Sequence, residues 1–233
     1  MTDFFPPRAY IMGAQKSGTT QLAAYLGQHP DICLSLPKEP HFYTQHWEKG
    51  LSWYAGKFSS VDKLLLDAST SYSCAPLPMY FPQDVDCNSA YSGIPERIKQ
   101  LSPEAQFIYI LRDPAKRAYS AYLHQVRAGL ESESFESAVL RDTYYLRTGH
   151  YAGQLELYLD HFPLSQFKLV FFEDFITNPE AVVRQCFSFL GLSEDVILNN
   201  EVSRNESFVY SGFWANLNAS MSSAGGITNL AKK

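Results

Sequence analysis

A short stretch rich in glycine and hydroxyl side chains carries the clearest chemical signal in the chain. It reads Gly13-Ala14-Gln15-Lys16-Ser17-Gly18-Thr19-Thr20 and lies between the apolar run Ala9–Met12 and the amphipathic segment Gln21–Leu26. This order predicts a turn from a strand into a helix. Glycines let the backbone curl so that several N–H groups converge, and the start of the helix adds its positive end. Because Lys16 places an ammonium within the loop, we expect the loop to bind a phosphate.

The loop departs from the Walker pattern G-x-x-x-x-G-K-[ST] at one decisive position. Gly13 and Gly18 have the Walker spacing, but Thr19 stands where the Walker lysine should be. The lysine that reaches the outer phosphates of ATP is therefore missing from its usual place. A turn that only joins a strand to a helix is the alternative interpretation, since glycine-rich turns are common in parallel α/β sheets.

A second group of hydrogen-bond donors follows another apolar run, Gln106–Leu111. Arg112 comes directly after this run, and Ser120 falls within the helix that we expect from about Ala115 to Ala128. A nucleotide with phosphates at both ends of its ribose needs two such sites, one for each phosphate. Alternatively, Arg112 pairs structurally with Asp113 or Glu173.

A carboxylate and an imidazole occur together in the stretch Pro37-Lys38-Glu39-Pro40-His41. The prolines hold Lys38 and Glu39 in a stiff, extended loop. Glu39 is either a solvated surface charge or a general base. His41, followed by two aromatic residues, is either a packed ring or a contact to a substrate.

Alternating strands and helices must position these residues. Strands are expected at Ala9–Met12, Asp31–Leu34, Lys63–Asp67, Gln106–Leu111 and Phe167–Phe172. Helices are expected at about Ser17–Gly27, Leu51–Lys57, Ile94–Leu101, Ala115–Ala128, from Ser134 onward, over Tyr151–Phe162 and at Pro179–Leu190. Continuous apolar strands favour an α/β fold with a central parallel sheet flanked by helices, which binds ligands at the carboxyl ends of its strands. The region from Cys74 to Ser92, rich in Pro, Tyr, Asp and Ser, is expected to be a long loop.

Length and composition fit one domain over residues 1–233, with its core at about 8–192 and a divergent tail or lid at 193–233. A net charge of −5 without any Lys/Arg run argues against binding to nucleic acid. The cysteines lack metal-binding or redox spacing, so buried thiols are expected, and a Cys74–Cys87 bond would need an oxidising compartment. The chain begins without a leader-like segment and has no long apolar span, so we expect a soluble, cytoplasmic protein.

Several motifs, in order, resemble those of the PAPS-dependent sulfotransferases, which transfer a sulfonyl group from 3′-phosphoadenosine 5′-phosphosulfate (PAPS). Gly13–Thr20 is similar to their 5′-phosphosulfate loop, and Tyr109–Ser120 to their 3′-phosphate motif. Lys38–Tyr43 resembles the segment that carries the general base in heparan sulfate 3-O-sulfotransferases and their bacterial relatives. Phe172–Asp174 and Phe189–Leu192 also fit. The resemblance covers the expected core and implies a P-loop-like nucleotide-binding fold.

The resemblance implies a role for each matching residue. Lys16 would stabilise the bridging oxygen as the phosphate leaves, Glu39 would take the proton from the acceptor hydroxyl or amine, and His41 would position that acceptor. PAPS would be held by Gln15, Lys16, Ser17, Gly18, Thr19, Thr20, Arg112 and Ser120. The product would be adenosine 3′,5′-bisphosphate, and no metal is implied.

Two departures from the family pattern bear on the acceptor and on the tail. Ala68 stands where the 3-O-sulfotransferase branch carries a lysine, which, with the acidic net charge, argues against a heparan-like acceptor. The Lys/Arg-Gly segment near the family's end has only a poor match at Arg204. We therefore expect a bacterial-type enzyme that acts on a small-molecule, lipid or saccharide acceptor, without stable membrane insertion. The alternatives are a P-loop kinase for a small metabolite, with Asp113 as its Mg²⁺ ligand and Mg-ATP as its donor, and a non-catalytic nucleotide-binding protein.

Overall fold

The computed structural model describes residues 6–86 and 89–199. The chain divides into two compact units, residues 1–200 and 201–233, and the described residues all belong to the first. Cys87 and Arg204 lie outside the described residues. The single domain expected for the whole chain, and the expected nature of its tail, therefore stay predictions.

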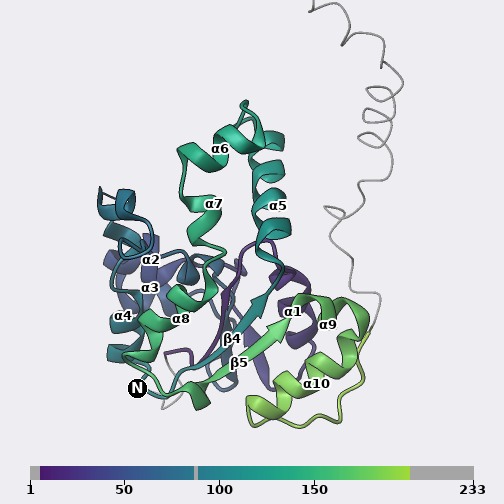
Figure 1. Ribbon diagram of the computed structural model, residues 1–233. Helices are drawn as coiled ribbons and strands as arrows, with labels where there is room; N and C mark the ends of the chain where they lie inside the picture. Colours follow the sequence, from purple (N-terminus) through teal and green to yellow (C-terminus); the bar gives the residue numbers. More distant parts are fainter. Residues whose placement is uncertain (1–5, 87–88, 200–233) are drawn as a thin grey trace, which may run out of the picture. The chain divides into compact units, whose positions relative to one another are not determined.

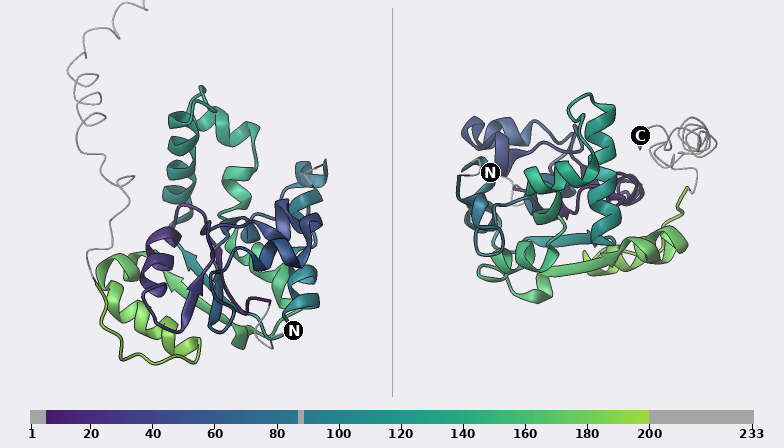
Figure 2. Two further views of the ribbon diagram at one scale, coloured as in Figure 1. Left: turned by 180° about the vertical axis from the view of Figure 1, so that it is seen from behind. Right: turned by 45° about the horizontal axis from the view of Figure 1, so that its top comes forward.

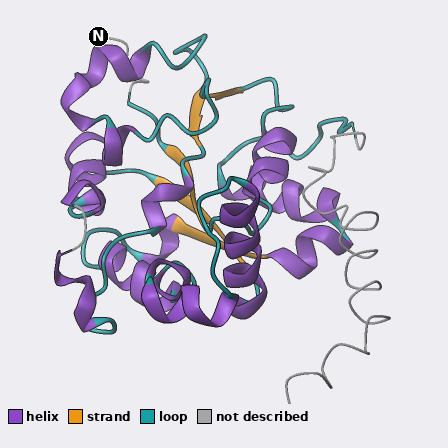
Figure 3. Ribbon diagram, turned by 90° about the horizontal axis from the view of Figure 1, so that it is seen from above, coloured by secondary structure: helices purple, strands orange, loops and turns teal. Residues whose placement is uncertain are grey.

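Five strands form one wholly parallel sheet in the order β2-β3-β1-β4-β5, seen edge-on between helices in Figure 3. They are β1 (Ala9–Gly13), β2 (Ile32–Leu34), β3 (Leu64–Asp67), β4 (Gln106–Leu111) and β5 (Phe167–Phe171). The central strand β1 is buried at every residue, because helices cover the sheet on both faces. The predicted α/β fold is confirmed.

The helices form two groups, one on each face of the sheet (Figures 1 and 2). One group holds α1 (Thr19–Leu26), α9 (Phe172–Thr177) and α10 (Pro179–Phe189). The other holds α2 (Phe42–Gln45), α3 (Gly50–Ala55), α4 (Ile94–Leu101) and α8 (Tyr151–Leu159). On the second face the core is largely aromatic: the rings of Tyr10 and Phe107 stack with their centroids 5.6 Å apart. Tyr10 and Phe107 are register partners on the neighbouring strands β1 and β4, so their side chains lie on the same face of the sheet.

A helical arm continues from the carboxyl end of β4 (Figure 1). It consists of α5 (Pro114–Arg127), α6 (Phe135–Arg141) and α7 (Tyr144–Arg147). The side chain of Asp113 caps α5 by accepting a hydrogen bond from the Lys116 backbone N–H at 2.8 Å. Ser134 caps α6 in the same way, as its sequence position predicts. The arm has a small core of its own, made by Ala118, Ala121, Ala138 and Tyr145.

The structure differs from the expected elements in several places, among them helix α2 (Phe42–Gln45), which was not expected. Strand β5 ends at Phe171, and Phe172 already begins helix α9, because Glu173 and Asp174 favour the first turn of a helix. The expected loop 74–92 contains short 3₁₀ helices at Pro82–Asp86 and Ser89–Tyr91. Helix α7 was not expected, since four residues are too few to show a period.

Two further expectations concern thiols and membranes. Cys33, Cys74 and Cys186 are buried free thiols. Within residues 6–86 and 89–199, no helix combines the length and the apolar character needed to cross a bilayer.

Candidate active site

The predicted phosphate loop joins β1 to α1 and needs glycine at both of its ends. Gly13 has φ 152°, and a Cβ there would lie 1.9 Å from Ser73 Oγ. Gly18 has φ 86°, and a Cβ there would lie 3.1 Å from the Phe172 ring. Between them Lys16 also has a left-handed backbone, with φ 68°. Such a conformation is uncommon for a residue with a side chain and persists only where the surroundings hold it.

Arg112 holds the loop from the neighbouring strand. Its Nη1 donates a hydrogen bond to the Lys16 carbonyl at 2.8 Å, and its guanidinium lies over the Phe172 ring, 4.7 Å from the centroid. Tyr151, at the start of α8, donates its hydroxyl to the Arg112 carbonyl at 2.7 Å. Tyr151 thus does more than pack against the core, because it also holds the backbone of Arg112. The two predicted phosphate-binding segments, which follow β1 and β4, are in direct contact.

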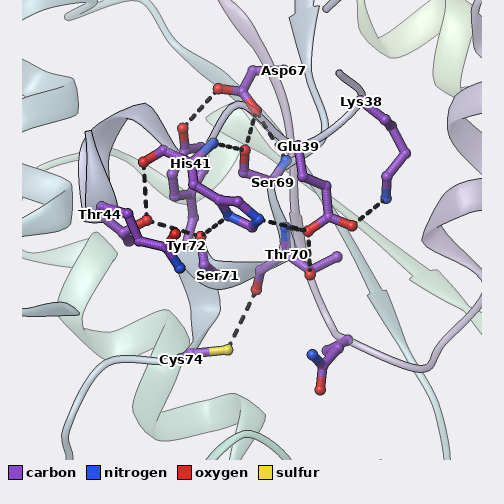
Figure 4. Close-up of polar contacts among 12 residues, drawn as sticks. Lys38, Glu39, His41, Thr44, Asp67, Ser69, Thr70, Ser71, Tyr72 and Cys74 are labelled. Atoms are coloured by element: carbon purple, nitrogen blue, oxygen red, sulfur yellow. Dashed lines mark hydrogen bonds and ion pairs between the residues drawn. The ribbon is translucent and has the colours of Figure 1, made fainter. Parts of the chain in front are cut away.

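The carboxylate of Glu39 is held by several donors (Figure 4). Its Oε2 accepts hydrogen bonds from Thr70, from the backbone N–H at 3.1 Å and from the hydroxyl at 2.8 Å. Its Oε1 forms an ion pair with Lys38 Nζ at 2.7 Å. Burial acts to raise the pKa of Glu39, but Lys38 and Thr70 outweigh it and hold this pKa below its ordinary value. Glu39 is therefore ionised at neutral pH and is not a freely solvated surface charge.

His41 is fixed by both its ring and its backbone. The ring Nδ1 lies 2.8 Å from Ser71 Oγ, so that Nε2 faces Glu39 Oε2 at 3.8 Å (Figure 4). The backbone of His41 is left-handed, with φ 52°, and its N–H donates to Ser69 Oγ at 3.0 Å. The His41 ring lies beside the Glu39 carboxylate and is only partly buried, which favours a contact to a substrate over a packed ring.

The buried carboxylate of Asp67 supports this arrangement through Ser69. Asp67 accepts the Ser69 hydroxyl at 2.6 Å and the hydroxyls of Tyr54 and Tyr72 at 2.6 and 2.7 Å. Burial raises the pKa of Asp67 in spite of these donors. The sequence could not show this support of Glu39 and His41, because the contacts join residues about one strand–helix unit apart.

Lys16 and Glu39 act on each other electrostatically. Burial lowers the pKa of Lys16, and the positive charges of Arg127 and Arg112 lower it further, whereas the negative charge of Glu39 opposes them. His124 on α5 belongs to the same group, because the charge of Lys16 lowers its pKa after burial has done so. The loop lysine and the candidate base follow β1 and β2, respectively, at the carboxyl edge of the sheet, and each acts on the other's charge.

The remaining predicted site residues lie in the expected elements. Ser17 and Thr19 are buried, and Thr20 is exposed on the first turn of α1. The side chain of Gln15 accepts a hydrogen bond from the Tyr144 hydroxyl at 2.5 Å. Ser120 lies half-buried on α5. The sequence motifs did not indicate the residues that hold Gln15, Glu39 and His41, which are Tyr144, Thr70 and Ser71.

A model of the family described as "Sulfotransferase domain" matches residues 6–224. The chain belongs to the sulfotransferase family. The P-loop-like fold implied by the resemblance is confirmed, since a solved sulfotransferase from Alicyclobacillus acidocaldarius has the same fold. That structure has a TM-score of 0.66 and 28% identity, and the match covers 94% of this chain and 90% of that one.

Curated relatives include two groups of heparan sulfate enzymes. Human heparan sulfate glucosamine 3-O-sulfotransferase 6 is 33% identical over 198 residues, covering 82% of this chain and 54% of the relative. Mouse heparan sulfate glucosamine 3-O-sulfotransferase 3B1 is 32% identical over 195 residues, covering 80% and 46%. Human bifunctional heparan sulfate N-deacetylase/N-sulfotransferase 2 is 30% identical over 207 residues, covering 80% and 22%. The chain thus spans about half the length of the 3-O-sulfotransferases that it matches.

Proposed function

We propose that this sulfotransferase-family protein moves a sulfonyl group from PAPS to a hydroxyl or amine of an acceptor by in-line displacement. The observation that carries the proposal is the 2.8 Å hydrogen bond from Arg112 Nη1 to the Lys16 carbonyl. It brings the two candidate phosphate-binding segments, which follow β1 and β4, into direct contact, as a nucleotide with a phosphate at each end of its ribose would need. PAPS is such a nucleotide, and when bound it supplies the activated sulfonyl group.

The residues present fit this donor. Loop N–H groups and the start of α1 form the cradle for the 5′-phosphosulfate, and a Cβ on Gly18 would press on Phe172. Arg112, with Ser120, would hold the 3′-phosphate. The Lys16 ammonium would neutralise charge on the leaving oxygen, which grows in the transition state. Glu39, ionised and next to His41, would accept the proton of the nucleophile.

The relatives and one local difference point to different classes of acceptor. The relatives' names place their activity on heparan sulfate, which supports a saccharide acceptor. Ala68, buried directly after β3, offers no ammonium to a sulfated chain. We therefore keep small-molecule and lipid acceptors beside saccharides. The cytoplasmic, bacterial setting expected from the sequence stays a prediction, and no observation favours the kinase alternative.

Calorimetric titration tests the donor site directly. The wild-type protein is expected to bind adenosine 3′,5′-bisphosphate without Mg²⁺ and not to bind Mg-ATP. Arg112→Ala is expected to weaken bisphosphate binding by about 10- to 100-fold, the usual loss for a hydrogen bond to a charged group. Arg184→Ala is the matched control, since Arg184 lies on α10 and pairs with Glu180 at 2.7 Å. This control should bind the bisphosphate as the wild type does.

Each other outcome has a distinct meaning. Binding of Mg-ATP with indifference to the bisphosphate would replace the proposal by a kinase. Binding of neither nucleotide would point to a protein that kept the fold without the cofactor site. Equal losses in both arginine variants would remove Arg112 from the 3′-phosphate site.

Replacing Lys38 by methionine is expected to move the acid limb of the kcat pH profile to higher pH. The substitution removes the ammonium that lowers the pKa of Glu39, whereas burial, which raises this pKa, stays. Glu39 then stays protonated up to a higher pH, and less of the base is present on the acid side. Lys49→Met, which removes an exposed lysine that stacks on Trp53, should leave the limb in place. An acid limb that does not move in Lys38→Met would show that Glu39 does not set it.

A further inference from the structure

Helix α7 reaches the phosphate loop through one side chain. The Tyr144 hydroxyl donates to Gln15 Oε1 at 2.5 Å, across 129 positions of sequence. Gln15 directly precedes Lys16, whose left-handed backbone needs support from outside the loop. Arg112 holds the Lys16 carbonyl on one side. Tyr144 holds the preceding side chain on the other.

The buried guanidinium of Arg117 holds α7 by a hydrogen bond. Arg117 of α5 is fully buried, and its Nη2 donates to the Tyr145 carbonyl of α7. Burial lowers the pKa of Arg117, and among the described residues no carboxylate pairs with it. Its Nε and Nη1 are buried without hydrogen-bond partners in the part of the chain that the structure describes. Such a charge is costly to bury unless it is hydrogen-bonded, so Arg117 depends on its bond to the Tyr145 carbonyl, which ties α5 to α7.

The buried carboxylate of Asp84 also holds α7. Asp84, in the 3₁₀ helix Pro82–Asp86, accepts hydrogen bonds from the Thr143 hydroxyl and from Arg147 Nη1, the latter at 3.2 Å. It also accepts the Leu77 backbone N–H at 3.2 Å. The side chain of Asp84 is fully buried. Arg117 and Asp84, two buried charged residues from different segments, thus both contact the four-residue helix α7. Their contacts lie just before and just after Tyr144, the residue that reaches the loop.

We propose that Tyr144 is a positioning residue for sulfonyl transfer: through Gln15 it fixes the backbone from which the Lys16 side chain projects. The buried contacts of Arg117 and Asp84 make α7 rigid enough to do this. Because Asp84 comes from the 74–92 region, α7 also links that region to the loop that would hold the donor. The inference rests on the proposed function, because it takes Lys16 as the group that neutralises charge on the leaving oxygen.

Comparison of Tyr144→Phe with Tyr122→Phe tests the inference. Both substitutions remove one hydroxyl from the arm, but the Tyr122 hydroxyl donates to the Glu133 carbonyl at 2.8 Å, near the turn into α6. For Tyr144→Phe we expect kcat to fall about 10- to 100-fold, the usual cost of a small misplacement of a catalytic group. The KM for PAPS and the affinity for adenosine 3′,5′-bisphosphate should change less than about threefold, since the backbone cradle remains. Tyr122→Phe should leave kcat unchanged.

Two further readouts separate positioning from a general loss of structure. In Tyr144→Phe the alkaline limb of the kcat profile should move to higher pH, because a less confined Lys16 is better solvated. Among the described residues, the charges of Arg127, Arg112 and Glu39 act on Lys16, and the charge of Lys16 acts on His124. A double-mutant cycle should show that Gln15→Ala adds little to Tyr144→Phe in kcat.

The outcomes are distinguishable. A wild-type protein without sulfonyl transfer or bisphosphate binding would defeat the proposed function itself. An active wild type with equal kcat in Tyr144→Phe and Tyr122→Phe would overturn the positioning role alone. Full additivity of Gln15→Ala and Tyr144→Phe would do the same.

Discussion

Replacing Lys16 by methionine is expected to lower kcat for sulfonyl transfer by about 10²- to 10³-fold, the usual loss when one group that stabilises developing charge is removed. Methionine keeps an unbranched side chain in the left-handed loop position and removes only the charge. Binding of adenosine 3′,5′-bisphosphate should change much less, because backbone N–H groups and Arg112 supply most of its contacts. Steady-state kinetics with saturating PAPS, together with calorimetry, measure the two effects.

The pH dependence of the wild type gives an independent view of Lys16. The lysine must be protonated to act, so activity is lost as the pH rises through its pKa. Burial, and then Arg127, lower this pKa from its ordinary value of 10.5, so the alkaline limb should lie below pH 10.5. Lys63→Met is a suitable control, because Lys63 is exposed and directly precedes β3, at the opposite end of that strand from Asp67. A kcat for Lys16→Met close to that of Lys63→Met would exclude Lys16 from the reaction.

Replacing Glu39 by glutamine is expected to lower kcat by about 10²-fold or more, while nucleotide affinity stays intact. Glutamine is nearly isosteric, and its carbonyl oxygen can still accept the hydrogen bonds of Thr70. It cannot take a proton from the acceptor. Since the pKa of Glu39 is lowered from 4.5, the acid limb of the wild-type profile should lie below that pH.

Glu48→Gln provides the matched comparison, since Glu48 is an exposed carboxylate on the segment that follows His41. Turnover should be unchanged in this variant. If Glu39→Gln also turned over at the wild-type rate, another group would have to be the base, or the acceptor would have to react without one.

Local patterns were sufficient to predict most of the fold. Each strand is a continuous apolar run, and parallel strands buried on both faces have no other pattern. The loop Gly13–Thr20 could be placed between a strand and a helix, because glycine spacing and the flanking runs are local features. The ends of elements were less certain: Phe172 is apolar enough for a strand, but the acidic residues after it begin a helix.

Local sequence patterns were thus enough to predict the fold class, the phosphate loop, and the candidates Lys16, Glu39 and Arg112. How these residues are held depends on contacts between distant parts of the chain. Glu39 meets Thr70 across 31 positions, Arg112 meets Lys16 across 96, and Gln15 meets Tyr144 across 129. No periodicity links residues so far apart, because such contacts depend on the order of strands in the sheet. The pKa values of Glu39 and Lys16 follow from the same cause, since burial and neighbouring charges exist only once the sheet has brought these segments together.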